Sequence, residues 1–254
     1  MNVQATIEQL QKLKLNGMAM VYKALTNLPI QERPDLDQFM ARLSQAEMQD
    51  RESRKSNMYL KTSKLRYQSV IEEVICSTEH NLSKDQLFAL ADCSFIRRAQ
   101  NLLITGKTGC GKSYLACALG RQACFMGYRT LYLGMNKFLE KLAQSRIDGS
   151  FLKLVNQIEK NDLIIFDDFG LQPLDTNTRL AILQILEDCY QRKTIIVTSQ
   201  LTVNKWYDYI GEPTLADAIM DRLVSNADRI ELGGDSLRKY KKKKNADILS
   251  ENLS

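Results

Sequence analysis

The stretch that decides the fold is Asn101-Leu-Leu-Ile-Thr-Gly106-Lys-Thr-Gly-Cys-Gly-Lys-Ser113. From Gly106 onward it matches the pattern G-x-x-x-x-G-K-[ST], with an apolar strand pattern before it and a helix pattern after it. In that context the backbone N–H groups of the loop and of the helix N-terminus cradle the phosphates of a nucleotide. We therefore predict a nucleotide site made by eight consecutive residues, Gly106, Lys107, Thr108, Gly109, Cys110, Gly111, Lys112 and Ser113.

Two aspartates follow a second apolar strand pattern at 163–166. Ligands bind at the carboxyl ends of the strands in open parallel sheets, which is where these two carboxylates would lie. We expect ATP as the nucleotide, with Lys112 on its β and γ phosphates and with Mg²⁺ held by Ser113 and Asp167. Asp168 is then the predicted catalytic acid, which positions and polarises the attacking water. The alternative for an Asp-Asp pair is a helix N-cap or a turn.

Two further polar residues are predicted to act in catalysis. Gln200 follows the strand pattern at 194–199, and in ATPases with an additional central strand a polar side chain there contacts the γ-phosphate or the water. A simple strand cap is the alternative for Gln200. Arg222 precedes the last strand pattern, and an arginine from a neighbouring subunit can stabilise charge on the transferred phosphoryl group. The alternative for Arg222 is a surface salt bridge with Asp217 or Asp221.

The order of the patterns predicts the domains. Residues 1–68 read as helical, with a turn around 27–34 and a long helix that begins after Asp35 or Asp37. Residues 69–100 are interpreted as a connector. In residues 101–237 strands alternate with helices, which predicts an α/β domain with a parallel sheet covered on both faces. The candidate strands are 101–105, 129–133, 163–167, 194–199 and 229–232, and residues 238–254 form a basic tail.

The positive charge of the chain is concentrated at its two ends. The net charge is +5 overall, +4 for residues 1–68, −3 for residues 69–237 and +4 for residues 238–254. Such asymmetry favours binding to nucleic acid, and a solvated basic surface is the alternative. Arg51 and Arg54 have an acidic residue four positions earlier and so are expected to brace the helix. The predicted DNA contacts lack such a partner or lie in the tail: Lys55, Lys61, Lys64, Arg66, Lys241, Lys242, Lys243 and Lys244. They predict phosphate-led binding to double-stranded DNA that is nearly independent of sequence.

Other classes of protein find little support in the sequence. No stretch approaches 18 uncharged apolar residues, so no membrane span is expected. Residues 1–15 are amphipathic and do not resemble a signal peptide. The six cysteines form no C-x-x-C pair and there is one histidine, which indicates free thiols in a reducing cytoplasm.

With these motifs in order, the chain resembles the IstB family, the AAA+ helper ATPases of insertion sequences, which are relatives of the bacterial helicase loader DnaC. The resemblance covers essentially the whole chain, including the helical N-terminal region and the short ending without a C-terminal lid. It rests on five segments: 101–106, 111–116, 163–170, 196–200 and 218–223.

The resemblance implies a P-loop AAA+ three-layer parallel sheet with a small all-helical N-terminal domain. It also implies a bacterial protein that self-assembles on DNA with ATP, hydrolyses ATP under stimulation by DNA, and assists a partner transposase in target selection. Arg222 matches the arginine-finger position and Gln200 the sensor-one position. Gln200 stands where asparagine is common and Asp168 where glutamate is usual, which would suit slow hydrolysis. The alternatives are a DnaC-type replicative helicase loader and a non-hydrolysing scaffold that ATP holds together on DNA.

Overall fold

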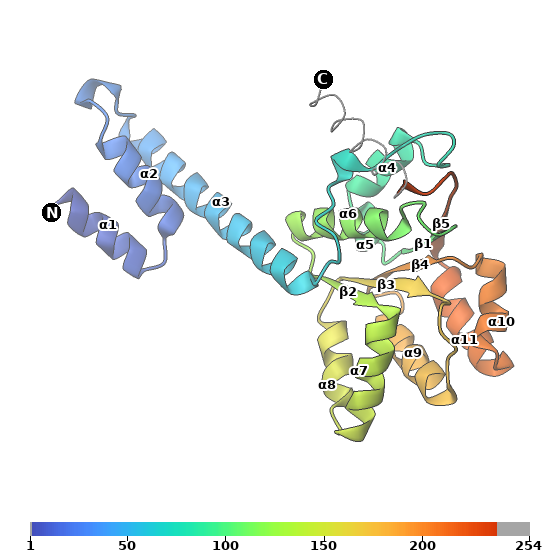
Figure 1. The fold of residues 1–254 in the computed structure, drawn as a ribbon. Helices are drawn as coiled ribbons and strands as arrows, with labels where there is room; N and C mark the ends of the chain where they lie inside the picture. Colours follow the sequence, from blue (N-terminus) through green and yellow to red (C-terminus); the bar gives the residue numbers. More distant parts are fainter. Residues whose placement is uncertain (1, 238–254) are drawn as a thin grey trace, which may run out of the picture. The chain divides into compact units, whose positions relative to one another are not determined.

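The computed structural model describes residues 2–237 (Figure 1). Its contacts divide the chain into two compact units, Met1–Met58 and Tyr59–Ser254, whereas the sequence placed the end of the helical region at residue 68. The basic tail at 238–254, with its four predicted DNA-binding lysines, lies outside the described residues. None of the described helices is long and apolar enough to cross a membrane.

The first unit is helical, as its apolar spacing predicts. It contains α1 (Val3–Lys12), α2 (Asn16–Thr26), the short 3-10 turn η1 (Ile30–Glu32) and most of α3 (Leu36–Ser63). The side chain of Asp35 accepts the N–H of Gln38 at 2.8 Å, so Asp35 is the residue that caps α3. The break between α1 and α2 was not predicted. The break lies at Lys14, whose φ of +60° is in the left-handed region that residues other than glycine seldom adopt.

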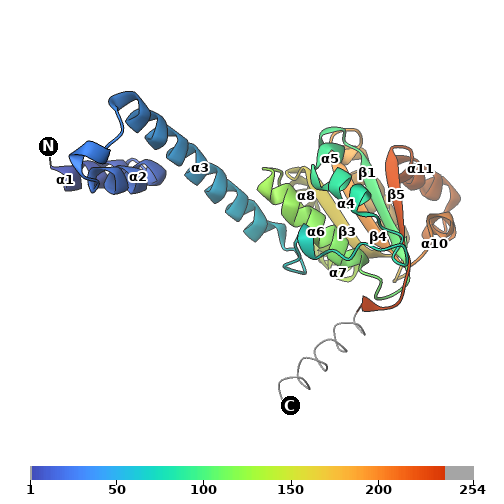
Figure 2. The ribbon, with the colours of Figure 1, turned by 90° about the horizontal axis from the view of Figure 1, so that it is seen from above.

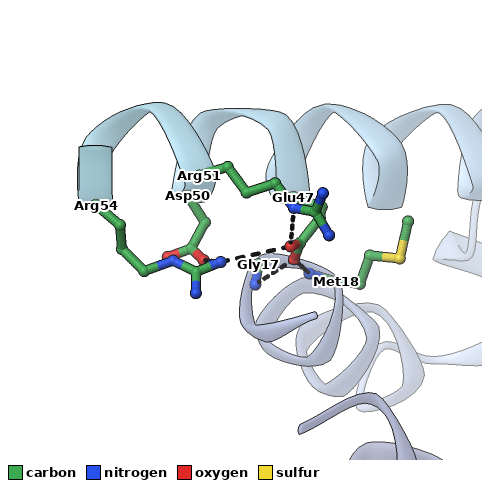
Figure 3. Close-up of polar contacts among 6 residues, drawn as sticks. All are labelled: Gly17, Met18, Glu47, Asp50, Arg51 and Arg54. Carbon is green, nitrogen blue, oxygen red and sulfur yellow. Dashed lines mark hydrogen bonds and ion pairs between the residues drawn. The ribbon is translucent and has the colours of Figure 1, made fainter. Parts of the chain in front are cut away.

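A buried carboxylate ties α2 to α3 within this unit (Figure 3). Glu47 is 5% exposed, and one of its oxygens accepts the backbone N–H of Gly17 at 3.0 Å and of Met18 at 3.4 Å. Both N–H groups belong to the first turn of α2, where no intrahelical acceptor exists. Arg51 donates to the other oxygen at 2.8 Å, and this hydrogen bond holds the pKa of Glu47 below its usual value. The predicted pairs of Glu47 with Arg51 and of Asp50 with Arg54 are both formed.

The second unit is built on a five-stranded sheet. Its strands are β1 (Asn101–Gly106), β2 (Thr130–Gly134), β3 (Leu163–Phe169), β4 (Thr194–Ser199) and β5 (Ala227–Leu232). All pairings are parallel, and the order is β2-β3-β4-β1-β5. The five predicted strands are therefore confirmed, and β4 is inserted between β1 and β3. Because all strands run the same way, the residues that follow β1, β3 and β4 meet at one edge.

Helices cover both faces of the sheet, which makes three layers (Figures 1 and 2). One face carries α4 (Lys84–Ala91), α5 (Ser94–Arg97) and α6 (Lys112–Phe125). The other carries α7 (Met135–Ile147), α8 (Phe151–Glu159), α9 (Thr176–Cys189), α10 (Trp206–Ile210) and α11 (Pro213–Val224). Alternate strand residues enter the two cores, with Leu103 and Ile164 on one side and Leu102 and Ile165 on the other. Burial on both faces explains why the strands read as continuous apolar runs.

Residues 69–100 are part of this unit and do more than connect. The 3-10 turn η2 (Ile71–Glu73), α4 and α5 supply Ile71, Leu87 and Phe95 to the core over β1 and α6. Ser83 and Gln86 form a capping box at the start of α4. The predicted connector is thus part of the helical layer that contains α6. It packs on β1, the strand that leads into the nucleotide motif.

Candidate nucleotide site

The loop between β1 and α6 has a backbone that only glycine adopts readily. Gly106, Gly109 and Gly111 have φ values of +146°, +88° and +99°, in the range that other residues avoid. A Cβ atom on Gly106 would lie 2.2 Å from the carbonyl oxygen of Leu232 on β5. The glycines of the motif are therefore required by the close approach of β5 and by the curvature of the loop.

Lys112 lies inside the curve of this loop. Its side chain is almost buried, and its Nζ donates to the carbonyl oxygens of Gly106 at 2.7 Å and Lys107 at 2.9 Å. Helix α6 begins at Lys112, so the N–H groups of its first turn have no partner within the helix. A positive side chain and a helix N-terminus together favour an anion in the loop, and the residues present fit a nucleotide phosphate.

Asp167 is fully buried near the end of β3, and two hydroxyl groups hold its carboxylate. Thr198 on β4 donates to Oδ1 at 2.6 Å, and Tyr132 on β2 donates to Oδ2 at 2.5 Å. Burial and the neighbouring carboxylate raise the pKa of Tyr132, so its phenol keeps the proton that it donates. No cluster of three His, Cys, Asp or Glu that could hold a metal occurs in residues 2–237. One carboxylate and the Ser113 hydroxyl suit Mg²⁺, which takes its other ligands from phosphates and water.

Asp168 occupies an irregularity in β3. The register of β3 against β4 shifts between Phe166 and Phe169, and Asp168 has a φ of +65°, which aspartate tolerates better than most residues. Its N–H donates to the hydroxyl of Thr198 at 3.0 Å. The helix N-cap alternative for Asp168 is wrong, because Asp175 caps the following helix α9.

Gln200 follows β4 and reaches the nucleotide loop. The hydroxyl of Thr108 donates to Gln200 Oε1 at 2.7 Å. The sequence separates these two residues widely, and the position of β4 beside β1 brings them together. The contact suits the predicted role of Gln200 near the γ-phosphate, and that role stays a prediction.

Arg222 is on α11 and lies beside the start of β1, whereas the nucleotide loop follows the end of that strand. The side chain of Asn101, the first residue of β1, donates to the backbone oxygen of Arg222 at 3.0 Å. A six-residue strand is roughly 17–20 Å long, so Arg222 is far from the loop at the other end of β1. Its guanidinium pairs with Glu187 of α9 at 2.8 Å, so the salt bridge expected with Asp217 or Asp221 has a different partner. Arg222 is therefore remote from the nucleotide loop of its own chain, and its role as an arginine finger stays a prediction.

The DNA-contact prediction needs a correction at Lys64 and Arg66. Helix α3 ends at Ser63, so neither residue lies on it, and Arg66 is not without acidic partners. Its Nη1 lies 3.6 Å from Asp167 Oδ2 and 3.5 Å from Asp168 Oδ2. No local pattern could reveal this pair, because the fold joins residues about a hundred positions apart. Lys55 and Lys61 are on α3, as expected.

Sequence comparison gives the family. The family described as "IstB-like ATP binding protein" matches residues 8–246, which is most of the chain. The chain belongs to this family. A putative insertion sequence ATP-binding protein of Sinorhizobium fredii, y4pL, is 39% identical over 239 residues, covering 94% of this chain and 98% of the relative. A second from the same organism, y4uH, is 37% identical and covers 93% and 95% of the two chains.

Comparison of structures agrees on the fold. The crystal structure of the DnaC helicase loader superposes with a TM-score of 0.55 at 17% identity, covering 66% of this chain and 99% of that one. The predicted resemblance and the AAA+ fold are therefore confirmed. Membership makes the chain an ATP-binding AAA+ protein of the insertion-sequence type.

Proposed function

We propose that this chain is an ATP-hydrolysing helper that assembles as a homo-oligomer on double-stranded DNA in the bacterial cytoplasm. In that state it assists a partner transposase in selecting the target site. The observation that carries the proposal is the separation of Arg222 from the nucleotide loop of its own chain. A complete site then needs two subunits, which ties hydrolysis to assembly.

Each side chain at the edge of the sheet has a role in this proposal. Lys112 leaves the carbonyl oxygens of Gly106 and Lys107 for the β and γ phosphates of ATP. Ser113 and Asp167 hold Mg²⁺, which neutralises charge that develops on the phosphates. Tyr132 and Thr198 fix the Asp167 carboxylate in place.

The water that attacks the γ-phosphate is positioned by other residues. Asp168 accepts its hydrogen bond, and Gln200 contacts it or the phosphate from the loop side. Arg222 of a neighbouring subunit stabilises the transferred group. Aspartate is one methylene shorter than glutamate, so slow turnover is expected, as would suit a timed switch.

DNA is held mainly through its phosphates. Lys55 and Lys61 on α3, Lys64 and Arg66 after it, and the tail lysines 241–244 supply the positive charge. Contacts of this kind position a protein on DNA without reading bases.

The names of the relatives favour the insertion-sequence role over a helicase loader. The relatives with 37–39% identity are insertion-sequence proteins, whereas the loader shares 17% identity, which indicates the fold alone. A transposase gene next to this one would support the helper, and replication genes there would support the loader.

The biochemical test uses the purified chain and unrelated duplexes. We expect ATP-dependent oligomers on DNA, seen by sedimentation, and phosphate release that DNA stimulates. Assembly with ATP but no phosphate release at saturating DNA would leave the non-hydrolysing scaffold. Absence of assembly under both conditions would contradict the proposal.

A further inference from the structure

A basic cavity lies beside the acidic end of β3. Its volume is about 540 Å³, and it is bounded by β2, α7, α8 and the segment after α3. Four cationic side chains line it, Lys64, Arg66, Lys137 and Lys141, against the single carboxylate of Asp168. The cavity therefore carries an excess of positive charge directly next to the predicted catalytic acid.

Three of these cations are not neutralised by the described protein. In residues 2–237, no ion pair engages Lys64, Lys137 or Lys141. Lys141 donates to Gln157 across the α7–α8 pair at 3.4 Å. Burial and the nearby charge of Lys64 lower the pKa of Lys141, so the two positive charges repel each other in this cavity. An anion bound in the cavity would offset that repulsion.

Arg66 belongs to the cavity and to the nucleotide site at once. It lines the cavity, and it lies within 3.6 Å of both Asp167 and Asp168. With Arg66 there, Asp167 shares its charge with a guanidinium, and Asp168 is a weaker acceptor for water. Asp167 would hold Mg²⁺ in the loaded site, and the positive charge of that ion would repel the guanidinium of Arg66.

We propose that this cavity binds the phosphate backbone of nucleic acid and that Arg66 makes its occupancy a switch for hydrolysis. A phosphate in the cavity draws Arg66 away from Asp167 and Asp168 and leaves both carboxylates to their roles at the nucleotide. Arg66 is thus a positioning residue that restrains hydrolysis until DNA is bound. This inference rests on the proposed function, to which it adds the place and the means of stimulation by DNA.

The switch works in both directions. DNA and Mg²⁺-ATP both favour the displaced position of Arg66 in this proposal. Each ligand must therefore tighten the binding of the other by the same factor. Arg66→Gln removes the guanidinium, which a DNA phosphate attracts and which a cation at Asp167 repels. We expect this variant to hydrolyse ATP several-fold faster without DNA, to gain little from DNA, and to lose the mutual tightening.

The cavity itself is tested by the double variant Lys137→Gln, Lys141→Gln. The matched control is Lys153→Gln, Lys160→Gln, which removes the same charge from exposed positions on or just after α8 that do not line the cavity. The salt slope of DNA binding falls by about one unit for each phosphate that the protein no longer binds. The cavity variant should lower that slope by about two and reduce stimulation, and the control should change neither.

Acetylation of lysines, read by mass spectrometry, gives a measurement that is independent of activity. In the full chain with ATP, a duplex should protect Lys137 and Lys141 and leave Lys153 reactive. Equal protection by inorganic phosphate or by a polyglutamate peptide at the same charge concentration would overturn nucleic acid as the occupant.

The remaining outcomes separate this inference from the proposed function. If DNA stimulates hydrolysis but leaves Lys137 and Lys141 reactive, or if Arg66→Gln keeps normal stimulation, the switch is wrong and the helper function stands. If Arg66→Gln instead abolishes hydrolysis with and without DNA, Arg66 supports the site and does not restrain it. A wild-type chain that neither binds DNA nor hydrolyses ATP would contradict the proposed function itself.

Discussion

The hydroxyl group of Thr198 on β4 donates to Asp167 on β3 at 2.6 Å, and the same oxygen accepts the N–H of Asp168 at 3.0 Å. One buried threonine of the neighbouring strand thus fixes the direction of the predicted Mg²⁺ ligand and the backbone of the predicted catalytic acid. The two hydrogen bonds join β4 to the part of β3 where its register shifts.

Replacement of Thr198 by valine tests this arrangement. Valine keeps the shape but leaves the buried Asp167 oxygen without a donor, which costs about 1–3 kcal/mol of the free energy of unfolding. We expect ATP hydrolysis to fall further than ATP binding, because the loop residues that grip the phosphates are untouched. Urea unfolding and steady-state kinetics measure the two effects. Thr198→Ser is the control, and it should restore both; a Thr198→Val chain with normal hydrolysis would show that the hydroxyl is dispensable.

Removal of the acid in Asp168→Asn should separate binding from hydrolysis. Asp167 and Ser113 remain for Mg²⁺, while the water loses its orienting carboxylate, so the variant is expected to bind ATP and retain it. Oligomers on DNA should then persist, which sedimentation with ATP detects. Asparagine also tolerates the positive φ at this position, so the fold is kept. Loss of ATP binding would instead make Asp168 a binding residue.

Local patterns in the sequence predict most of this fold. The five strands and the loop at Gly106 are visible because each is a continuous apolar run or a fixed glycine spacing. The sequence predicts only a connector at residues 69–100, because Leu87 and Phe95 reach the core from short elements without a long periodic apolar stripe. The turn at Lys14 has no glycine at the position with positive φ, and the nearby Asn16 and Gly17 belong to the first turn of α2.

Contacts in the site between residues far apart in the chain could not be predicted from the sequence. Tyr132 and Arg66 contact the acids from a neighbouring strand and from the segment after α3, and nothing near them in the chain indicates this. From its spacing in the sequence Arg66 is predicted only as a DNA contact, whereas the fold also places it beside Asp167 and Asp168. Side chains within one motif were predictable, whereas the residues that support them were not.

The close approach of α2 to α3 at Gly17 can be tested by adding a side chain there. A Cβ atom there would lie 2.3 Å from the backbone oxygen of Ala46 on α3, so α2 would have to move away. Alanine is the better helix former, yet overpacking of this kind costs about 1–3 kcal/mol. We expect Gly17→Ala to reduce amide protection in α2 in hydrogen exchange. Gly134→Ala is the control, since its nearest contact is at 3.8 Å; equal protection in the two variants would contradict the close approach.

Mixed oligomers test whether Arg222 acts between subunits. Arg222→Ala should bind ATP but not hydrolyse it, and Lys112→Ala should fail in ATP binding, assembly and hydrolysis. A mixture should regain part of the activity, because an intact loop of one chain can face an intact arginine of another. Phosphate release from the mixture, compared with each variant alone, is the measurement. Mixed oligomers that form and stay inactive would place the arginine's role within its own chain.

The contribution of the basic tail is the final prediction. Neutralising Lys241, Lys242, Lys243 and Lys244 with glutamine should weaken binding to all duplexes alike and flatten its dependence on salt, by about one unit of slope for each phosphate that the tail no longer binds. The nucleotide loop keeps all its residues, so ATP binding should be unchanged. The measurement is affinity for two unrelated duplexes over a salt series with ATP present.

Two results would revise this view of DNA binding. An unchanged salt slope would mean that the tail is only solvated and that Lys55 and Lys61 on α3, with the cavity lysines, bind the phosphates. Strong discrimination between the two duplexes would contradict phosphate-led binding, since phosphates are the same in every sequence. A slope reduced equally for both duplexes is the outcome that phosphate binding by the tail requires.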